Sequence, residues 1–326
     1  MRHPLLQVRD LTKYFEIRKS LLGRTSTTLK AVDGVTFDVF PGETVGIVGE
    51  SGCGKSTLAR TLMWLEEPTS GSITFSGAPI SSTNASSLRR QMQIVFQDPY
   101  TSLPPRMTIE DIVADPIRIH EKRSQSEIRE SVRRLLTEVG IGPERAGLYP
   151  FQFSGGQRQR IGIARALAVN PQLLILDEAV SALDVSVQSQ ILNLLKDLQQ
   201  DLGLTYIFIS HDLGVVRYLS DRVLVMYLGK VVEEGPAAEL YREPHHPYTR
   251  ALLSAIPTLK GRRAEHTRLR GEPPKPTSPP PGCAFHTRCP MAQPVCSVEA
   301  PVLRPSGPGR SSACHFAELL AESGTL

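Results

Sequence analysis

The sequence predicts an α/β fold with a parallel-sheet core, an antiparallel β edge, a helical subdomain and a small Cys-containing C-terminal extension. Two observations carry most of this prediction. Residues 44–48 form a short apolar run that leads into a glycine-rich loop and then a helical pattern over 55–65. From 173 to 227, apolar runs alternate with helical patterns, and Leu173–Leu176 is continuously apolar, as strands buried in parallel sheets are.

Hydrophobic periodicity places the remaining elements. Residues 5–15 and 29–40 alternate apolar and polar side chains, as half-buried strands do, and the basic segment 18–30 between them is expected to be an exposed loop. Further strands are expected at 72–75, 92–96, 204–209 and 222–227, further helices at 127–139, 157–169, 187–202 and 212–219, and a hairpin turn at Leu228-Gly229.

Composition changes after Pro244. A short helix is expected over 247–257, and Gly271–Gly282 carries six prolines and should be an extended linker. We therefore expect a core domain over 1–245, with its helical subdomain at about 88–165, and a C-terminal extension over 246–326.

Composition and charge argue against a membrane-spanning protein, a secreted protein and a nucleic-acid-binding protein. The 326 residues are 40% apolar, enough for one large core, and no run of 18 apolar residues predicts a membrane span. The first residues are too quickly polar for a secretory signal, which favours the cytosol. The net charge is +4, but segment 260–310 alone holds nine Lys and Arg against three Glu. A basic tail of this kind is usually a solvated surface, with contact to anionic lipid headgroups as the alternative, and it does not support nucleic-acid binding.

The glycine-rich loop, Gly49-Glu-Ser-Gly-Cys-Gly-Lys-Ser-Thr57, fits the phosphate-loop pattern G-x-x-x-x-G-K-[ST]. Glycines allow backbone N–H groups to turn inward around phosphates, and the N-terminus of the following helix adds its positive end. Lys55 is expected to reach the β- and γ-phosphates, and the Ser56 hydroxyl to ligate Mg²⁺. The predicted nucleotide-binding residues of the loop are Gly49, Ser51, Gly52, Cys53, Gly54, Lys55, Ser56 and Thr57.

Two carboxylates follow the buried strand at 173–176. Asp177 is placed to hold Mg²⁺ through water, and Glu178 is placed to polarise an attacking water. An Asp-Glu pair after apolar residues is often only structural. Its position about 120 residues after a phosphate loop favours the second half of a nucleotide site.

A second phosphate-holding segment, Ser154-Gly-Gly-Gln157, precedes the helix predicted at 157–169. One nucleotide does not need two such segments, so the second is expected to serve the nucleotide of a neighbouring copy. This order of segments resembles the ATP-binding cassette (ABC) family, in which two ATPase domains close head-to-tail around two ATPs. The resemblance implies that Ser154, Gly155, Gly156 and Gln157 bind the γ-phosphate of the partner's ATP.

Three single residues match further landmarks of that family. The resemblance implies that Gln97 senses Mg²⁺ and water, that His211 contacts the γ-phosphate, and that Tyr14 stacks on adenine, with Phe15 as the alternative. Ser181–Asp184 resembles the segment that lines the dimer interface. Phe153 and Ala179-Val180 depart from the usual residues, but the acid Glu178 is retained.

The sequence His246-Pro-Tyr-Thr-Arg-Ala-Leu252 and the Cys-rich tail resemble the ATPase subunits of oligopeptide and dipeptide importers, in particular the F-type subunit of a D/F pair. This resemblance implies a D-type ATPase subunit as heterodimer partner, two membrane permease subunits docking near 97–110, and an extracytoplasmic peptide-binding protein. It also implies a peripheral location on the cytoplasmic face of the cell membrane. Nickel, opines, glutathione or antimicrobial peptides are alternative cargoes, and a soluble cassette protein acting on DNA or the ribosome is a rival class.

Four cysteines, Cys283, Cys289, Cys296 and Cys314, lie close together in this tail. Their spacing matches neither a compact zinc knuckle nor a ferredoxin motif, and disulfides are disfavoured in a cytosolic chain. Some members of the resembling family ligate a [4Fe–4S] cluster with this tail, which implies the same here. A zinc site and four free thiols are the alternatives.

Overall fold

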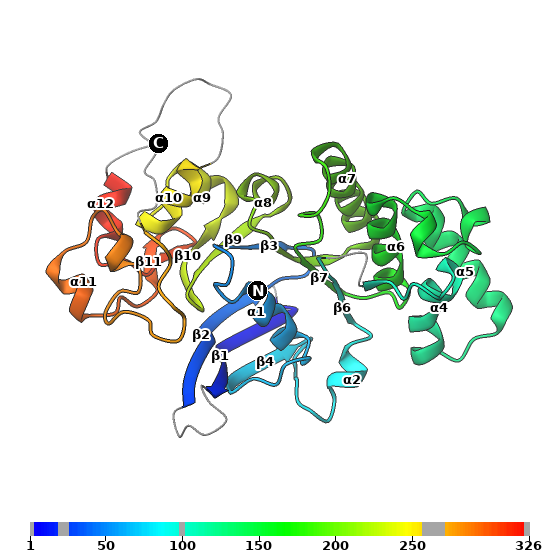
Figure 1. Cartoon of the computed structure of the whole chain (residues 1–326), viewed down its shortest axis with the longest axis horizontal. Coiled ribbons are helices and arrows are strands. Elements are labelled where there is room, and N and C mark those ends of the chain that lie inside the picture. Colours follow the sequence, from blue (N-terminus) through cyan, green and yellow to red (C-terminus); the bar gives the residue numbers. More distant parts are fainter. Residues whose placement is uncertain (1–2, 19–25, 98–101, 256–270, 323–326) are drawn as a thin grey trace. The chain divides into compact units, whose positions relative to one another are not determined.

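The computed structural model describes residues 3–18, 26–97, 102–255 and 271–322 (Figure 1). Contacts within the chain group it into two compact units. The helical unit comprises residues 1–3, 40–43 and 80–209. The phosphate-loop unit comprises residues 4–39, 44–79 and 210–326. Each unit has its own strands and helices, and each is described below by itself.

Three parallel strands form the sheet of the helical unit: β6 (Met92–Val95), β7 (Leu173–Asp177) and β8 (Thr205–Ile209). Every residue of β7 and β8 is buried, which explains why these segments are continuously apolar. The α/β prediction is thereby confirmed. The helices of this unit are α2 (Ala85–Leu88), α4 (Ile109–His120), α5 (Gln125–Glu138), α6 (Gly155–Leu167) and α7 (Val185–Leu202), with 3₁₀ turns η1 (Pro143–Arg145) and η2 (Pro150–Gln152).

Side-chain caps fix where these helices begin. Ser124 and Glu127 form a reciprocal capping box at α5, and Ser154 and Gln157 form another at α6. Because Ser154 is the cap, α6 begins at Gly155, two residues before the predicted start. In α5 the predicted apolar face is the buried one (Ile128, Val132, Leu135 and Leu136).

Two sheets make up the phosphate-loop unit. The first is antiparallel, in the order β2-β1-β4-β5, with bounds Ser26–Val39, Leu6–Arg18, Ser70–Phe75 and Ala78–Pro79. This sheet is the predicted antiparallel edge. Its first two strands are longer than expected, so much of the predicted loop 18–30 is strand, and residues 19–25 lie outside the described residues. In the second sheet, β3 (Thr44–Val48) is parallel to β9 (Arg222–Tyr227), and β9 is antiparallel to β10 (Lys230–Pro236).

The predicted hairpin is present between β9 and β10. Leu228 and Gly229 both have positive φ, 45° and 80°, and Tyr227 pairs with Lys230 across the turn. Two consecutive positive φ angles match the twist of the flanking strands. The helices of this unit are α1 (Lys55–Leu62), α8 (Leu213–Leu219), α9 (Ala237–Arg242), α10 (Pro247–Ser254), α11 (Pro294–Val298) and α12 (Ala317–Glu322), with the 3₁₀ turn η3 (His286–Arg288).

The C-terminal extension adds two strands to the sheet of β3, β9 and β10. Strand β12 (Arg310–Ser312) pairs with β10, and β11 (Arg304–Gly307) pairs with β12. The sequence analysis did not predict either strand, since both are short and neither has an alternating apolar pattern. The domain boundary at 245/246 stays a prediction.

Within the described part of the chain, no helix has both the length and the apolar character that crossing a membrane requires.

A buried carboxylate connects the extension to β10. Glu233 has 1% of its surface exposed, and its two oxygens accept the backbone N–H groups of His245 (2.6 Å) and His246 (3.0 Å). A guanidinium nitrogen of Arg310, on β12, lies 3.5 Å from the same carboxylate. Burial raises the pKa of Glu233 to about 7.

We expect Glu233→Ala to lower the free energy of unfolding by about 3–5 kcal/mol, because it leaves the buried Arg310 charge without its carboxylate. Urea unfolding at pH 8, where Glu233 is ionised, measures the loss. The neighbouring and more exposed Glu234 is the control, and Glu234→Ala should cost at most about 1 kcal/mol. Equal midpoints for the two variants would contradict a structural role for Glu233.

Candidate functional site: a phosphate loop, a capped helix N-terminus and a cysteine pocket

The loop 49–57 connects β3 to α1 through backbone conformations that only glycine adopts easily. Gly49, Gly52 and Gly54 have φ of 155°, 77° and 109°. A Cβ on Gly54 would lie 2.0 Å from the carbonyl oxygen of Ala31, and one on Gly49 would lie 2.2 Å from that of Met226. The loop is therefore pressed against two other segments of its unit, which explains why glycine is needed at both positions.

Lys55 lies at the centre of this loop. Its side chain is buried, and its Nζ donates hydrogen bonds to the carbonyl oxygens of Gly49 (2.8 Å) and Glu50 (3.1 Å). The residue begins α1, whose cap, Gly54, supplies no side-chain bond to the first turn. An ammonium group at the N-terminal end of a helix is an arrangement that favours the binding of anions.

Tyr14 is connected to the loop through two hydrogen-bonded residues. Its hydroxyl donates a short hydrogen bond to the Asp33 carboxylate. The Asp33 N–H donates to the Gly229 carbonyl (2.9 Å), and the Gly229 N–H donates to the Cys53 carbonyl (2.9 Å). Burial, together with Asp33, raises the pKa of Tyr14 to about 12, so the phenol stays protonated at neutral pH. On a strand, the neighbouring Phe15 projects from the opposite face.

His211 precedes α8 and is exposed. The next residue, Asp212, caps that helix by accepting the backbone N–H groups of Gly214 (2.8 Å) and Val215 (3.3 Å). The cap fixes the direction of the chain immediately after the histidine.

In the helical unit, Asp177 ends β7 and is 5% exposed. Glu178 follows with φ of 50°, a left-handed conformation that is costly for a residue with a side chain. Its N–H donates to the Ile209 carbonyl (2.9 Å) and its carbonyl accepts the Ser181 N–H (3.1 Å), so the turn is held on both sides. Gln97 is exposed just after β6, and residues 98–101 of the predicted docking segment lie outside the described residues.

The signature segment, Ser154–Gln157, forms the first turn of α6. A Cβ on Gly156 would lie 2.3 Å from a methyl group of Val187, so this glycine lets α6 approach α7 closely. Ser154 is exposed at the helix N-terminus. The unusual Phe153 is buried, and the Arg145 guanidinium lies over its ring, 4.2 Å from the ring centroid.

The predicted nucleotide residues are thus divided between the two units. Loop 49–57, Tyr14 and His211 belong to the phosphate-loop unit; Gln97, Asp177, Glu178 and the signature segment belong to the helical unit. The chain also carries Mg²⁺-compatible oxygen donors at the predicted positions Ser56, Gln97 and Asp177.

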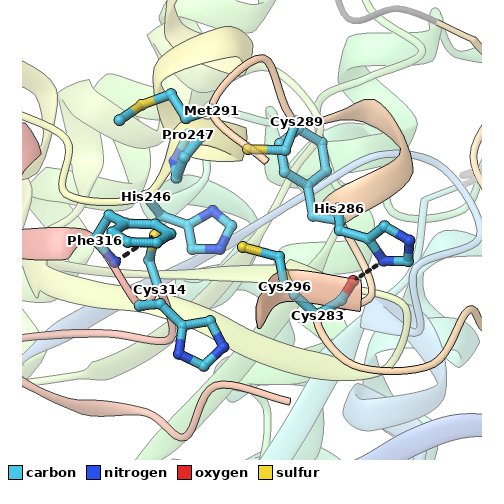
Figure 2. Close-up of a pocket in the computed structure, with 11 residues that line it drawn as sticks. His246, Pro247, Cys283, His286, Cys289, Met291, Cys296, Cys314 and Phe316 are labelled. Carbon is cyan, nitrogen blue, oxygen red and sulfur yellow. Dashed lines mark hydrogen bonds between the residues drawn. The ribbon is translucent and has the colours of Figure 1, made fainter. Parts of the chain in front are cut away.

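The four tail cysteines line one pocket in the phosphate-loop unit (Figure 2). All four are free thiols, and they share the pocket with His246, Pro247, Phe285, His286, Met291, His315 and Phe316. The cavity volume is about 10 Å³, the space of roughly one water. Burial raises the pKa of Cys289 and of Cys314 to about 11, and also raises that of Cys283.

The sulfur donors of the pocket suit a soft metal or an iron–sulfur cluster. Among the described residues, however, no three His, Cys, Asp or Glu side chains lie close enough to hold a single metal ion. The four cysteines thus share one pocket without the close approach of three ligands that a single bound ion needs.

Sequence reasoning missed three residues beside the phosphate loop. Glu50 occupies a variable position of the loop motif, yet its carboxylate receives two hydrogen bonds from Arg288 and its N–H donates to the Tyr248 hydroxyl (2.9 Å). Arg288 and Tyr248 belong to the C-terminal extension. No local pattern in the sequence links residues about 200 positions apart.

Comparison with known families and proteins identifies the family of the chain. The family described as "ABC transporter" matches residues 32–181, and "Oligopeptide/dipeptide transporter, C-terminal region" matches residues 232–296. The oligopeptide transport ATP-binding protein AppF of Bacillus subtilis is 52% identical over 319 residues, covering 96% of this chain and 97% of that protein. The chain belongs to the ABC transporter ATPase family.

Another relative of this ABC ATPase has a similar name, and two solved structures have a similar fold. The putative peptide import ATP-binding protein BOV_A0347 of Brucella ovis is 51% identical, covering 95% of this chain and 97% of that protein. The solved structure of CbiO1 from Clostridium perfringens has a TM-score of 0.63 and 32% identity, covering 73% of this chain and 90% of that one. The ADP- and Pi-bound dimeric cassette MJ0796 also has a TM-score of 0.63, with 29% identity, covering 71% and 98%. The α/β fold and the ATPase class are thus confirmed.

Two loop glycines allow a matched test of the phosphate-loop geometry. We expect Gly54→Ala to displace the loop and to abolish ATP binding, because its Cβ would meet a backbone oxygen at 2.0 Å. A Cβ on Gly52 would have no atom within 4 Å, so Gly52→Ala should lower the free energy of unfolding by only about 1 kcal/mol, the cost of a left-handed backbone conformation for alanine. Thermal unfolding of the nucleotide-free chain measures this loss for both variants. A Gly54→Ala variant as stable as Gly52→Ala would contradict the close approach.

Proposed function

We propose that this ABC ATPase energises the import of oligopeptides or dipeptides through separate membrane permease subunits, at the cytoplasmic face of the membrane. The observation that carries the proposal is the match of residues 232–296 to the C-terminal region of oligopeptide and dipeptide transporters. The names of relatives that align over nearly the whole chain support it. An extracytoplasmic peptide-binding protein delivers the cargo to the permease, and the ATPase does not contact it.

Each site residue has a proposed role in ATP hydrolysis. The loop residues Gly49, Ser51, Gly52, Cys53, Gly54, Lys55, Ser56 and Thr57 hold the phosphates, and Lys55 neutralises the β- and γ-phosphates. Ser56, Gln97 and Asp177 are the proposed Mg²⁺ residues, and the ion would draw charge from the phosphate oxygens. Glu178 polarises the attacking water, and His211 contacts the γ-phosphate.

Tyr14 is the proposed adenine-stacking residue in preference to Phe15. Its connection through Asp33 and Gly229 to the phosphate loop fixes the phenol on the loop side of β1. The hydrogen bond to Asp33 holds the ring in one orientation, which lowers the entropic cost of stacking a base on it.

The signature segment is proposed to bind the γ-phosphate of a partner ATPase subunit. Ser154 caps α6 and is exposed, so the helix N-terminus with its partial positive charge faces outward. We propose a D-type subunit as the partner, and thus a heterodimer with two ATP sites. The related cassette MJ0796 is described as dimeric, which supports pairing of this kind.

We expect Glu178→Gln to retain ATP binding and to lose hydrolysis by a factor of about 10² or more, since the amide cannot accept the proton of the attacking water. Phosphate release measures turnover, and binding of a fluorescent ATP analogue measures occupancy. Asp197→Asn, on α7, is the control and should hydrolyse ATP normally. Normal phosphate release by Glu178→Gln would remove Glu178 from this role.

The proposed cargo class has its own test. Uptake of labelled di- and oligopeptides in the native host should be lost with Glu178→Gln and retained with Asp197→Asn. Peptide uptake unaffected by Glu178→Gln, with uptake of nickel or glutathione lost, would replace peptides as the cargo and leave the ATPase role intact.

We further propose that Cys283, Cys289, Cys296 and Cys314 ligate a [4Fe–4S] cluster, with zinc as the alternative metal. The support is the set of four free thiols around one apolar pocket. A cluster there would join four separate stretches of a segment that has little apolar core of its own.

Anaerobic purification followed by iron, sulfide and zinc analysis tests this proposal. We expect about four irons and four sulfides per chain, and their loss when Cys289 and Cys296 are both changed to Ser. Cys53→Ser, in the phosphate loop, is the matched control and should keep its iron. Stoichiometric zinc without iron would favour the alternative, and absence of both metals would discard the metal site.

A further inference from the structure

Glu50 is the residue through which the C-terminal extension reaches the phosphate loop. It directly follows Gly49, and its carbonyl accepts a hydrogen bond from the Lys55 ammonium at 3.1 Å and from the Cys53 N–H at 3.3 Å. The peptide that carries Glu50 therefore helps to place the lysine that is proposed to bind the phosphates. Contacts that fix the position of Glu50 therefore also help to fix the position of the Lys55 ammonium group.

The extension holds Glu50 at its other polar groups. Arg288 donates from both terminal nitrogens to the two carboxylate oxygens, at 2.7 and 2.9 Å. The Glu50 N–H donates to the Tyr248 hydroxyl at 2.9 Å. The Arg288 side chain is 4% exposed and that of Glu50 is 23% exposed, so this is a two-pronged ion pair largely removed from water.

Arg288 lies in the turn 285–289, in which Phe285, His286 and Cys289 line the cysteine pocket. It ends η3 and directly precedes Cys289. Backbone hydrogen bonds run through this turn, from the His286 N–H to the Cys283 carbonyl (3.0 Å) and from the Cys289 N–H to the His286 carbonyl (3.3 Å). The backbone between the two cysteines is thus one hydrogen-bonded turn, and a change in the separation of Cys283 and Cys289 moves Arg288 with it.

Aromatic packing makes the connection stiff. Phe285, in the same turn, is 1% exposed and lies 5.4 Å from the ring centroids of both Tyr227 and Tyr248. The two tyrosine rings are 4.7 Å apart. Because close-packed rings leave little free space, a displacement of the turn that carries Phe285 also displaces Tyr227 and Tyr248.

We infer that Arg288 is a positioning residue for the phosphate loop, and that it links the state of the cysteine pocket to the affinity for ATP. This inference rests on the proposed function at two points, ATP binding by the loop and metal binding by the pocket. A filled pocket fixes the turn 283–289, Arg288 then fixes Glu50, and Glu50 keeps Lys55 in the position that binds phosphates. An empty pocket loosens the turn and weakens ATP binding.

The first experiment measures ATP affinity in the metal-free full-length chain. Arg288→Gln should weaken MgATP binding by at least about tenfold, which corresponds to ~1.4 kcal/mol, and should raise KM for ATP while kcat changes by less than about twofold. Arg304→Gln is the control, because Arg304 makes a similar two-pronged pair with Glu318 inside the extension (2.5 and 2.9 Å). Equal affinity for Arg288→Gln and wild type would overturn the positioning role.

A second variant separates positioning from misfolding. Glu50→Gln keeps the shape of the side chain and removes its charge, so it should weaken ATP binding as Arg288→Gln does. The double variant should be no weaker than either single variant, because all three lose the same pair. Additive losses would mean that the two residues act separately and would overturn the inference.

The second experiment compares the metal-loaded with the metal-stripped chain. In wild type and Arg304→Gln, stripping should weaken MgATP binding severalfold, whereas in Arg288→Gln the loaded and stripped forms should bind equally. The iron content of the metal-loaded samples should be the same in wild type, Arg304→Gln and Arg288→Gln. An equal effect of stripping in Arg288→Gln and wild type would overturn the link. A chain without iron or zinc would overturn the pocket's proposed metal and the link with it, while the first experiment would still decide the role of Arg288.

Discussion

Close approach of backbone to backbone at the phosphate loop is the constraint on which the rest of the phosphate-loop unit depends. Gly49 and Gly54 each leave no room for a side chain, because carbonyl oxygens of Met226 and Ala31 occupy the space where a Cβ would stand. Ala31 lies on β2 and Met226 on β9, so the loop is enclosed by strands from both sheets of the unit. These contacts restrict the loop to its observed conformation.

The β9–β10 hairpin extends this constraint. Gly229 at its turn lies against Ala31 as well, and its N–H donates to the Cys53 carbonyl. The turn therefore does more than connect two strands, since it supplies part of the wall of the loop and, through Asp33, part of the support of Tyr14. A residue with a side chain at Gly229 would disturb both.

Sequence patterns predicted the elements whose causes are local. Continuous apolar runs identified β7 and β8, because a strand that is buried on both faces carries apolar side chains on both. The Leu228-Gly229 turn was predictable because a tight two-residue hairpin requires positive φ. The start of α6 was misplaced by two residues, since the Ser154 cap allows glycines, poor helix formers, to enter the first turn.

The candidate site divides in the same way. The loop glycines and Lys55 could be identified as candidate site residues from the fixed spacing of their motif. The four cysteines could be identified from their clustering in the sequence. The bond between Glu50 and Arg288 could not, because one partner sits at a motif position that accepts many residues and the other 238 residues away. Buried Glu233 was also missed, because a charged residue within a strand pattern is usually assigned to the solvent face.

The two strands of the extension also decide how the sheet of the phosphate-loop unit ends. Strand β10 is seven residues long. Without a neighbouring strand, the N–H and C=O groups on its outer side would be unpaired and could form hydrogen bonds with a strand of another chain. Strand β12 takes up part of that edge, and the last strand, β11, is four residues long and contains Pro305, which has no N–H to offer. The extension thereby protects a long, well-formed strand from pairing between chains, a form of solubility control that would be lost by truncation before residue 304.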